Sequence, residues 1–199
     1  MSRLTLADIA DLRAYERERD GFRAEIIALK KRRRVGVGPV VTFLFENRDT
    51  VRFQIQEMAR AERMLTDEAI ENELAAYNPL IPDPGSLSAT MFIELTSPAE
   101  VRAWLPKLAG VERSVKLRIG AATVAAELEA GHASRLTRDD VTASVHYVRF
   151  VLSEAEVGAF AERPVSVAVE HPAYSYATQL RPETHRELLG DLAGRRAGS

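Results

Sequence analysis

The sequence contains no cysteine. This absence excludes disulfide bonds, thiolate zinc sites, cysteine-ligated iron–sulfur clusters and a cysteine nucleophile. Apolar runs are also short, and none approaches the roughly 18 residues that suggest a membrane span. Charged side chains at Arg3, Asp8 and Asp11 stand where a signal peptide needs an apolar stretch. We therefore expect a cytoplasmic protein that does not associate with membranes.

The composition is that of a soluble globular protein. Of the 199 residues, 46% are hydrophobic and 28% are charged, and the net charge is −2, so the chain can bury a core and is not expected to be disordered. The charge is unevenly placed. Residues 1–34 hold 10 Lys and Arg against 6 Asp and Glu, a net charge of +4, whereas the rest of the chain has a net charge of −6.

The first part of the chain shows helical periodicity around one strand. Apolar residues three and four positions apart predict one or two helices over 6–34, with Gly21 as a candidate break. Glycines and a proline over 35–39 predict a turn, and residues 40–45 predict a buried strand. Residues 50–65 and 66–77 predict an αα-hairpin, and the proline-rich segment 78–85 predicts a loop.

After this loop the hydrophobic pattern changes mainly to alternation. Strands are expected at 89–95, 115–119, 122–128, 142–152 and 165–171, and helices at 97–110, at 153–161 and from Pro182 onward. Helices followed by strands that are linked by hairpins or short helices indicate an α+β fold with a mostly antiparallel sheet. We expect one domain over 1–199, with a helical N-terminal part (1–77) and a sheet-rich part (86–190).

Several short segments resemble a known family. They include Phe43-Leu-Phe-Glu, Gln54-Ile, the segment Asn78-Pro-Leu-Ile-Pro, Leu87-Ser-Ala-Thr and His146-Tyr. Over nearly its whole length the chain resembles the uncharacterised bacterial family called domain of unknown function 3501. The resemblance implies no established activity. Its members are often gene neighbours of rubrerythrin-like non-haem iron proteins and iron–sulfur oxidoreductases, which implies a role beside a redox or oxidative-stress system.

Five adjacent cations are the strongest local charge feature: Lys30, Lys31, Arg32, Arg33 and Arg34. At the C-terminal end of a helix they are favoured by the helix dipole, and the simplest interpretation is a solvated helix end. The alternative is a surface that binds an anion or an acidic partner. Nucleic acid is not expected, because the rest of the chain is acidic and no aromatic residues interleave with the run.

Carboxylates on the expected αα-hairpin give a second candidate. Glu57 and Glu62 lie on the helix over 50–65, and Glu62 falls on its apolar stripe, so its carboxylate is expected to point inward. Glu62 and Glu73 could approach one another as in a di-iron bundle. Such bundles, however, use a Glu-x-x-His pattern that this segment lacks. A salt bridge to Arg60, Arg63 or an N-terminal arginine is the simpler interpretation.

Two histidines on expected strands give a third candidate. If the strands that carry His146 and His171 are neighbours, these side chains could converge with Glu94 as two histidines and one carboxylate, a set suited to non-haem iron or zinc. Arg149 and Tyr174 could then surround the site, together with Tyr147. The alternative is that these histidines are structural and hydrogen-bonded. His132 and His185 are expected to be exposed.

No complete catalytic set emerges from these patterns. Our preferred hypothesis is a non-catalytic binding or accessory protein, homo-oligomeric or partnered with a redox protein such as a rubrerythrin-like or iron–sulfur protein. The alternative hypothesis is a metal-dependent redox enzyme or metal sensor that uses iron or zinc. A third interpretation is a small-molecule pocket between the αα-hairpin and the sheet, rimmed by the proline-rich loop.

Overall fold

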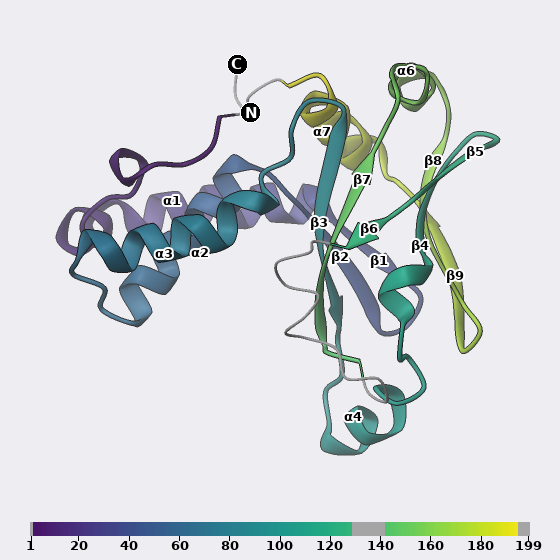
Figure 1. Cartoon of the computed structure of the whole chain (residues 1–199), viewed down its shortest axis with the longest axis horizontal. Coiled ribbons are helices and arrows are strands. Elements are labelled where there is room, and N and C mark those ends of the chain that lie inside the picture. Colours follow the sequence, from purple (N-terminus) through teal and green to yellow (C-terminus); the bar gives the residue numbers. More distant parts are fainter. Residues whose placement is uncertain (1, 129–141, 195–199) are drawn as a thin grey trace.

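Two antiparallel sheets form the centre of the molecule (Figure 1). The computed structural model describes residues 2–128 and 142–194. The first sheet has the order β1 (Arg34–Val37), β2 (Val41–Glu46), β3 (Ser86–Ile93), β7 (Val145–Val151) and β6 (Glu127–Leu128). The second sheet has the order β5 (Ala122–Ala125), β4 (Val115–Ile119), β8 (Val165–His171) and β9 (Tyr174–Gln179). Every strand pair is antiparallel, which confirms the expected α+β class.

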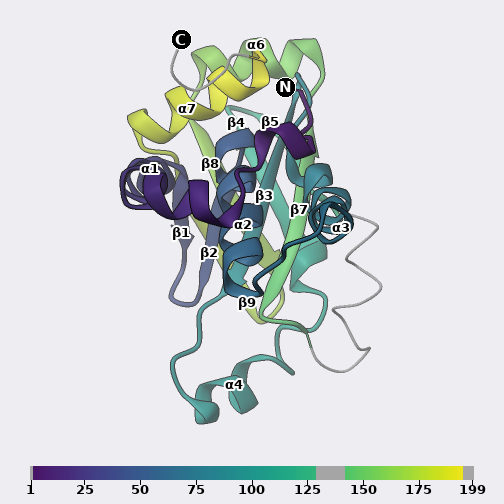
Figure 2. The same ribbon diagram turned by 90° about the vertical axis from the view of Figure 1, so that its left-hand side faces the viewer.

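Helices cover the outer face of the first sheet. The three longest of this layer are α1 (Leu12–Arg33), α2 (Arg48–Ala61) and α3 (Asp67–Tyr77), which lie in front of the first sheet in Figure 2. The other helices of the described residues are α4 (Pro98–Trp104), α6 (Glu154–Glu162) and α7 (Pro182–Leu192), and short 3₁₀ turns span Leu6–Asp8, Asn78–Leu80 and Val111–Ser114. Within the described ranges, no helix combines the length and the apolar character needed to cross a membrane.

The main core lies between the two sheets. Alternate residues of β2, β3 and β7 point inward, including Phe43, Met91 and Phe150, and meet the inward valines and leucine of the second sheet, such as Leu117 and Val167. A smaller core, formed by residues such as Val51, Ile55 and Leu74, lies under α2 and α3. Because successive strand residues point to opposite faces, the same strands leave a second set of side chains facing the helices.

The N-terminal helix is continuous through Gly21, which the sequence pattern indicated as a candidate break. Helix α1 runs through Gly21, which is exposed and where an added Cβ atom would meet no other atom within 4 Å. A glycine inside a helix costs only about 1 kcal/mol. The buried residues Tyr15, Ile26 and Leu29 on either side hold α1 against the protein, and this packing outweighs the local preference.

Two strands were not expected from the sequence. Residues 34–37 form β1 rather than a turn, because Val35 and Val37 are buried and the strand pairs with β2. The turn itself comes at Gly38, which has a φ of 72° and lies so close to the Tyr174 and Tyr176 side chains that a Cβ atom would clash. Strand β9 follows a short turn after β8, and its mostly exposed residues lack the buried alternation that marks the other strands.

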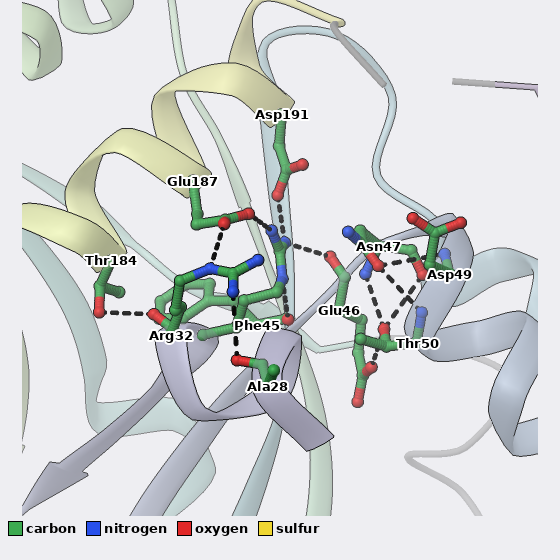
Figure 3. Close-up of polar contacts among 11 residues, drawn as sticks. Ala28, Arg32, Phe45, Glu46, Asn47, Asp49, Thr50, Thr184, Glu187 and Asp191 are labelled. Carbon is green, nitrogen blue, oxygen red and sulfur yellow. Dashed lines mark hydrogen bonds and ion pairs between the residues drawn. The ribbon is translucent and has the colours of Figure 1, made fainter. Parts of the chain in front are cut away.

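The basic run ends in a completely buried arginine. The Arg33 guanidinium donates from Nε to the carbonyl oxygen of Phe45 (2.8 Å) and from Nη2 to that of Glu46 (3.1 Å). Nη2 also forms an ion pair with the Asp191 carboxylate, and Nη1 lies 3.5 Å from Glu187 Oε2 (Figure 3). Arg33 therefore joins α1, the end of β2 and α7. The interpretation of this residue as part of a solvated helix end is wrong.

Helix α7 also satisfies backbone groups at the end of α1. The Thr184 hydroxyl donates to the carbonyl oxygen of Arg32 (2.6 Å), and Arg181 donates to that of Lys31 (3.0 Å). The last carbonyls of a helix have no partner within the helix. The C-terminal helix thus supplies these partners from residues about 150 positions away in sequence.

Replacing Arg33 by methionine is expected to lower the free energy of unfolding by about 3–5 kcal/mol, because Asp191 and two carbonyl groups are then buried without their partner. The neighbouring Arg32 pairs with Glu187 at the surface, where its side chain is 44% exposed. Arg32→Met is therefore expected to cost about 1 kcal/mol or less. Urea unfolding followed by circular dichroism measures both variants, and equal losses would contradict the role given to Arg33.

Candidate functional site

A pocket lies between the outer face of the first sheet and the helical layer. Its volume is about 280 Å³. Polar and charged side chains from several elements line it: Lys30, Arg34, Glu46, Gln54, Tyr77, Thr90 and Tyr147. The other lining residues are apolar: Leu44, Val51, Leu80, Phe92 and Val145. An apolar cavity with a few converging polar groups is the usual form of a small-molecule site.

Strand register builds the floor of this pocket. Arg34 of β1 pairs with Leu44 of β2, Leu44 pairs with Thr90 of β3, and Thr90 pairs with Tyr147 of β7. These four residues form one row across four strands. Residues in such a row point to the same face of a sheet. This face is opposite the main core, so the alternation that fills the core also turns this row toward the helices.

Glu46 is the buried carboxylate of the pocket. Its side chain accepts a hydrogen bond from the Thr50 hydroxyl (2.5 Å) at one oxygen and from the Thr90 hydroxyl (2.6 Å) at the other. The residue is only 8% exposed. Thr50 belongs to the first turn of α2, whose N-cap is Asn47. Thr50 at the start of α2 and Thr90 on β3 therefore hold the carboxylate in place, one at each oxygen.

Two cations approach the pocket from the end of α1. The Arg34 guanidinium pairs with the Glu94 carboxylate (3.0 Å) and lies over the Phe92 ring, 5.7 Å from its centroid. The Lys30 ammonium lies 5.0 Å from the centroid of the Phe53 ring. Burial lowers the pKa of Lys30, and the negative charge of Glu46 partly opposes this effect.

Two phenols complete the polar lining. Burial, together with the nearby Tyr77 and Glu46, raises the pKa of Tyr147 to about 12. Burial also raises the pKa of Tyr77, and a hydrogen bond with Gln54 partly opposes that rise. Both phenols therefore stay protonated at neutral pH and can donate or accept hydrogen bonds. The arrangement can hold a polar molecule by charge, hydrogen bonds and apolar contact.

The structure does not bring the expected metal ligands together. His146 lies on β7 of the first sheet, His171 lies on β8 of the second sheet, and these strands are not paired. The Glu94 carboxylate, 50% exposed, binds Arg34 and the Thr42 hydroxyl instead. The condition for this metal site, that the two strands are neighbours, is not met, because alternation places a side chain on a face but does not choose the partner strand. In the part of the chain that the structure describes, no three metal-binding side chains cluster.

Both strand histidines have hydrogen-bond partners within the fold. His146 Nε2 lies 2.8 Å from the Thr142 hydroxyl and 2.9 Å from the carbonyl oxygen of Ala143. Burial lowers the pKa of His146, and the negative charge of Glu112 opposes that effect. His171 Nε2 lies 3.1 Å from the carbonyl oxygen of Ala109.

The other two histidines were expected to be exposed. His185 is half-buried instead, because its ring stacks on that of Phe160 and its Nε2 lies 2.6 Å from the carbonyl oxygen of the same residue. His132 lies outside the described residues.

The carboxylates of α2 serve the packing of the helices. Glu57 accepts hydrogen bonds from the Tyr15 hydroxyl (2.7 Å) and from two nitrogens of Arg19 (2.8 and 2.9 Å). Glu57 thus forms an ion pair with Arg19, an arginine of the N-terminal part. Glu62 is exposed at the C-cap of α2, so the expectation that its carboxylate points inward was wrong. Helix α2 ends at Ala61, whereas the apolar stripe in the sequence predicted a helix that continues to residue 65.

The two remaining candidates hold turns in place. Arg149 on β7 donates to the carbonyl oxygen of Pro79 (2.9 Å) and lies 3.7 Å from Asp83, so it fastens the proline-rich loop beside the pocket. The buried Tyr174 hydroxyl donates to the carbonyl oxygen of Val37 (2.7 Å). It also accepts hydrogen bonds from two backbone N–H groups at the start of β2. Tyr174 thus closes the turn between β1 and β2.

The basic run is largely neutralised within the chain. Arg32, Arg33 and Arg34 each pair with a carboxylate. Lys31 is exposed, and Lys30 lines the pocket. The expected anion-binding surface therefore has fewer free cations than the sequence indicates, and its binding of an anion or partner stays a prediction.

The comparisons with known proteins place the chain in a family. The family model described as "Protein of unknown function (DUF3501)" matches residues 3–192. The chain belongs to the DUF3501 family. A crystal structure of a protein of unknown function from Burkholderia pseudomallei K96243 is 37% identical, with a TM-score of 0.88, and the match covers 96% of this chain and 100% of that one. No curated protein matches the chain.

Sequence reasoning placed the pocket of this DUF3501 protein but missed most of its residues. A pocket between the αα-hairpin and the sheet, beside the proline-rich loop, was one of three interpretations, whereas Glu46, Gln54 and Thr90 were not proposed as site residues. A signal was present, because these three residues and Tyr147 lie in the segments that carry the family resemblance. What the sequence did not show is the register that aligns them.

The ion pair of Glu57 gives a pH dependence that can be measured. Hydrogen bonds from Arg19 lower the pKa of Glu57 below its ordinary value. Its stabilising contribution is therefore complete above the ordinary pKa and is lost as the pH falls from the ordinary pKa through the lowered one. We expect Glu57→Gln to show a smaller loss of unfolding free energy across this interval than the wild type.

Arg19→Met is the matched variant, because it removes the partner and leaves the carboxylate. It is expected to show the same smaller loss on acidification. Urea unfolding at several pH values measures all three proteins. If both variants lose as much unfolding free energy on acidification as the wild type, this ion pair does not contribute to acid sensitivity.

Proposed function

We propose that this DUF3501 protein is a non-catalytic binding protein that holds a small organic molecule in the pocket between the first sheet and α1, α2 and α3. The observation that carries the proposal is the convergence of charged, hydroxyl, phenol and amide groups on a pocket of about 280 Å³ that also has apolar walls. Small-molecule sites combine these features. The main core, by contrast, is filled by apolar side chains.

The state of the pocket groups supports binding rather than catalysis. Glu46, the buried carboxylate, accepts a hydrogen bond from one threonine hydroxyl at each oxygen, which holds it as a fixed acceptor in the pocket wall. Tyr147 stays protonated at neutral pH, since its pKa is raised to about 12. The histidines of the described ranges lie on other parts of the fold, where their ring nitrogens meet backbone or threonine groups.

The family resemblance adds a setting to this proposal. We propose an accessory role in the cytoplasm beside a redox or oxidative-stress system, with a rubrerythrin-like or iron–sulfur protein as the partner and a homo-oligomer as the assembly. Support for this setting comes from gene neighbourhood within the resemblance. The pocket gives such an accessory protein a means to respond to a small molecule, since a bound ligand stabilises the state that binds it.

Filling the pocket tests the proposal. Val145 lines the cavity, and Val151 lies on the same face of the same strand but is 53% exposed and does not line it. Val145→Trp is expected to lower the affinity for small fragments at least tenfold. Val151→Trp is expected to keep the wild-type affinity. Ligand-observed NMR with a library of fragments of about nine non-hydrogen atoms measures the loss.

Thermal unfolding by circular dichroism checks that both tryptophan variants fold. A wild-type protein that binds no fragment of the library would overturn the proposed function. So would fragment binding that is unchanged in a folded Val145→Trp variant, because the fragments would then occupy a different surface.

A further inference from the structure

Among the described residues, one charged group of the pocket lacks a partner of opposite charge. Glu46 is satisfied by two hydroxyls, and Arg34 is paired with Glu94. Within residues 2–128 and 142–194, the Lys30 ammonium forms no ion pair, and its defined contact is the face of the Phe53 ring. A half-buried ammonium without a carboxylate is an unusual arrangement, because removing a charge from water without compensation is unfavourable.

Two features place this ammonium at the pocket. Lys30 lies one helical turn before the buried Arg33, which anchors the end of α1 to β2 and α7. The Phe53 ring of α2 lies 5.0 Å from the ammonium. The ammonium therefore presents its positive charge at the pocket lining.

The charges around the pocket limit what can bind beside Lys30. Glu46 lines the same pocket as Lys30, so its carboxylate disfavours a ligand that carries two negative charges. The guanidinium of Arg34, the second cation of the lining, has its charge balanced by the carboxylate of Glu94. One unit of negative charge on the ligand matches the single positive charge of the Lys30 ammonium.

The apolar residues of the pocket indicate the shape and polarity of the uncharged part of the ligand. Phe92, Leu44 and Val145 form an apolar wall on the sheet side, and Val51 and Leu80 face it from the helical side and the proline-rich loop. A pocket of about 280 Å³ lies near the lower end of the range for small-molecule sites, so it suits a compact molecule such as a single substituted ring.

We propose that the pocket binds a small organic monocarboxylate with a compact apolar or aromatic body, and that the Lys30 ammonium holds its carboxylate. This inference rests on the proposed function, because it names the class of ligand for the same site. The carboxylate accepts charge-assisted hydrogen bonds from Lys30, which are stronger than those between neutral groups. The ring or hydrocarbon body packs against Phe92 and its apolar neighbours.

Three probes of the same size separate charge from shape. Benzoate, benzamide and benzamidine share a phenyl ring and differ in charge by one unit each. We expect benzoate to bind about tenfold more tightly than benzamide, and benzamidine to bind most weakly, as measured by ligand-observed NMR titration at pH 7. Lys30→Met is expected to remove the preference for benzoate over benzamide and to leave the affinity for benzamide within about twofold.

Lys31→Met is the matched control, because Lys31 is the adjacent residue but is exposed and does not line this pocket. It is expected to keep the wild-type preference. Thermal unfolding of both variants shows whether they are folded. If Lys30→Met does not fold, Lys30→Gln is used instead, since it keeps a polar end group without the charge.

The outcomes distinguish this inference from the proposed function. Equal affinities for the three probes, or a preference that survives in the Lys30 variant, overturn the inference while the pocket remains a binding site. Tightest binding of benzamidine also overturns it and assigns the selective charge to Glu46. If the wild type binds none of the three probes but binds other fragments that Val145→Trp abolishes, the monocarboxylate class is wrong and the binding function stands.

Discussion

The buried guanidinium of Arg33 is the interaction on which the arrangement of the pocket depends. It joins three elements that are distant in sequence: the end of α1, the end of β2 and the C-terminal helix α7. Lys30 lies one turn before Arg33, and Arg34 follows it directly, so the two cations of the pocket are positioned by the same anchor. The backbone of Glu46 accepts from Arg33 while its side chain faces the cavity.

A buried ion pair is not the most stable way to fill such a position. Apolar side chains of similar size often give equal or greater stability, because charges lose their hydration on burial. Burial indeed raises the pKa of Asp191, and Arg33 only partly opposes that rise. What an apolar residue cannot supply is a planar set of donors for two carbonyl groups at the end of a strand. The arginine thus fixes where β2 ends and where α2 begins.

Local structure could be predicted well from the sequence where one physical rule acts alone. Alternating valines placed the strand at Val165–His171 with its observed bounds, and Ser97 and Ser153 mark helix starts that the structure confirms with capping hydrogen bonds. Pairing between strands depends on the whole fold. Sequence patterns therefore offer no means of knowing that His146 and His171 lie in different sheets. For the same reason, the row of residues from Arg34 to Tyr147 could not be predicted.

Charge patterns were misleading for a related reason. Burial of one cation within Lys30–Arg34 requires an acidic partner that is distant in sequence, here Asp191.

The two faces of the first sheet are built differently, and the difference bears on function. The inner face is apolar apart from His146, whereas the covered outer face carries Glu46, Thr90 and Ser88, all buried. A sheet face covered by helices is most stable when it is apolar, since buried polar groups must find partners. Departures from that rule are expected where a protein binds something. The polar residues of the outer face line a pocket, whereas the core between the sheets is closely packed, and for this reason we propose the binding function for the pocket.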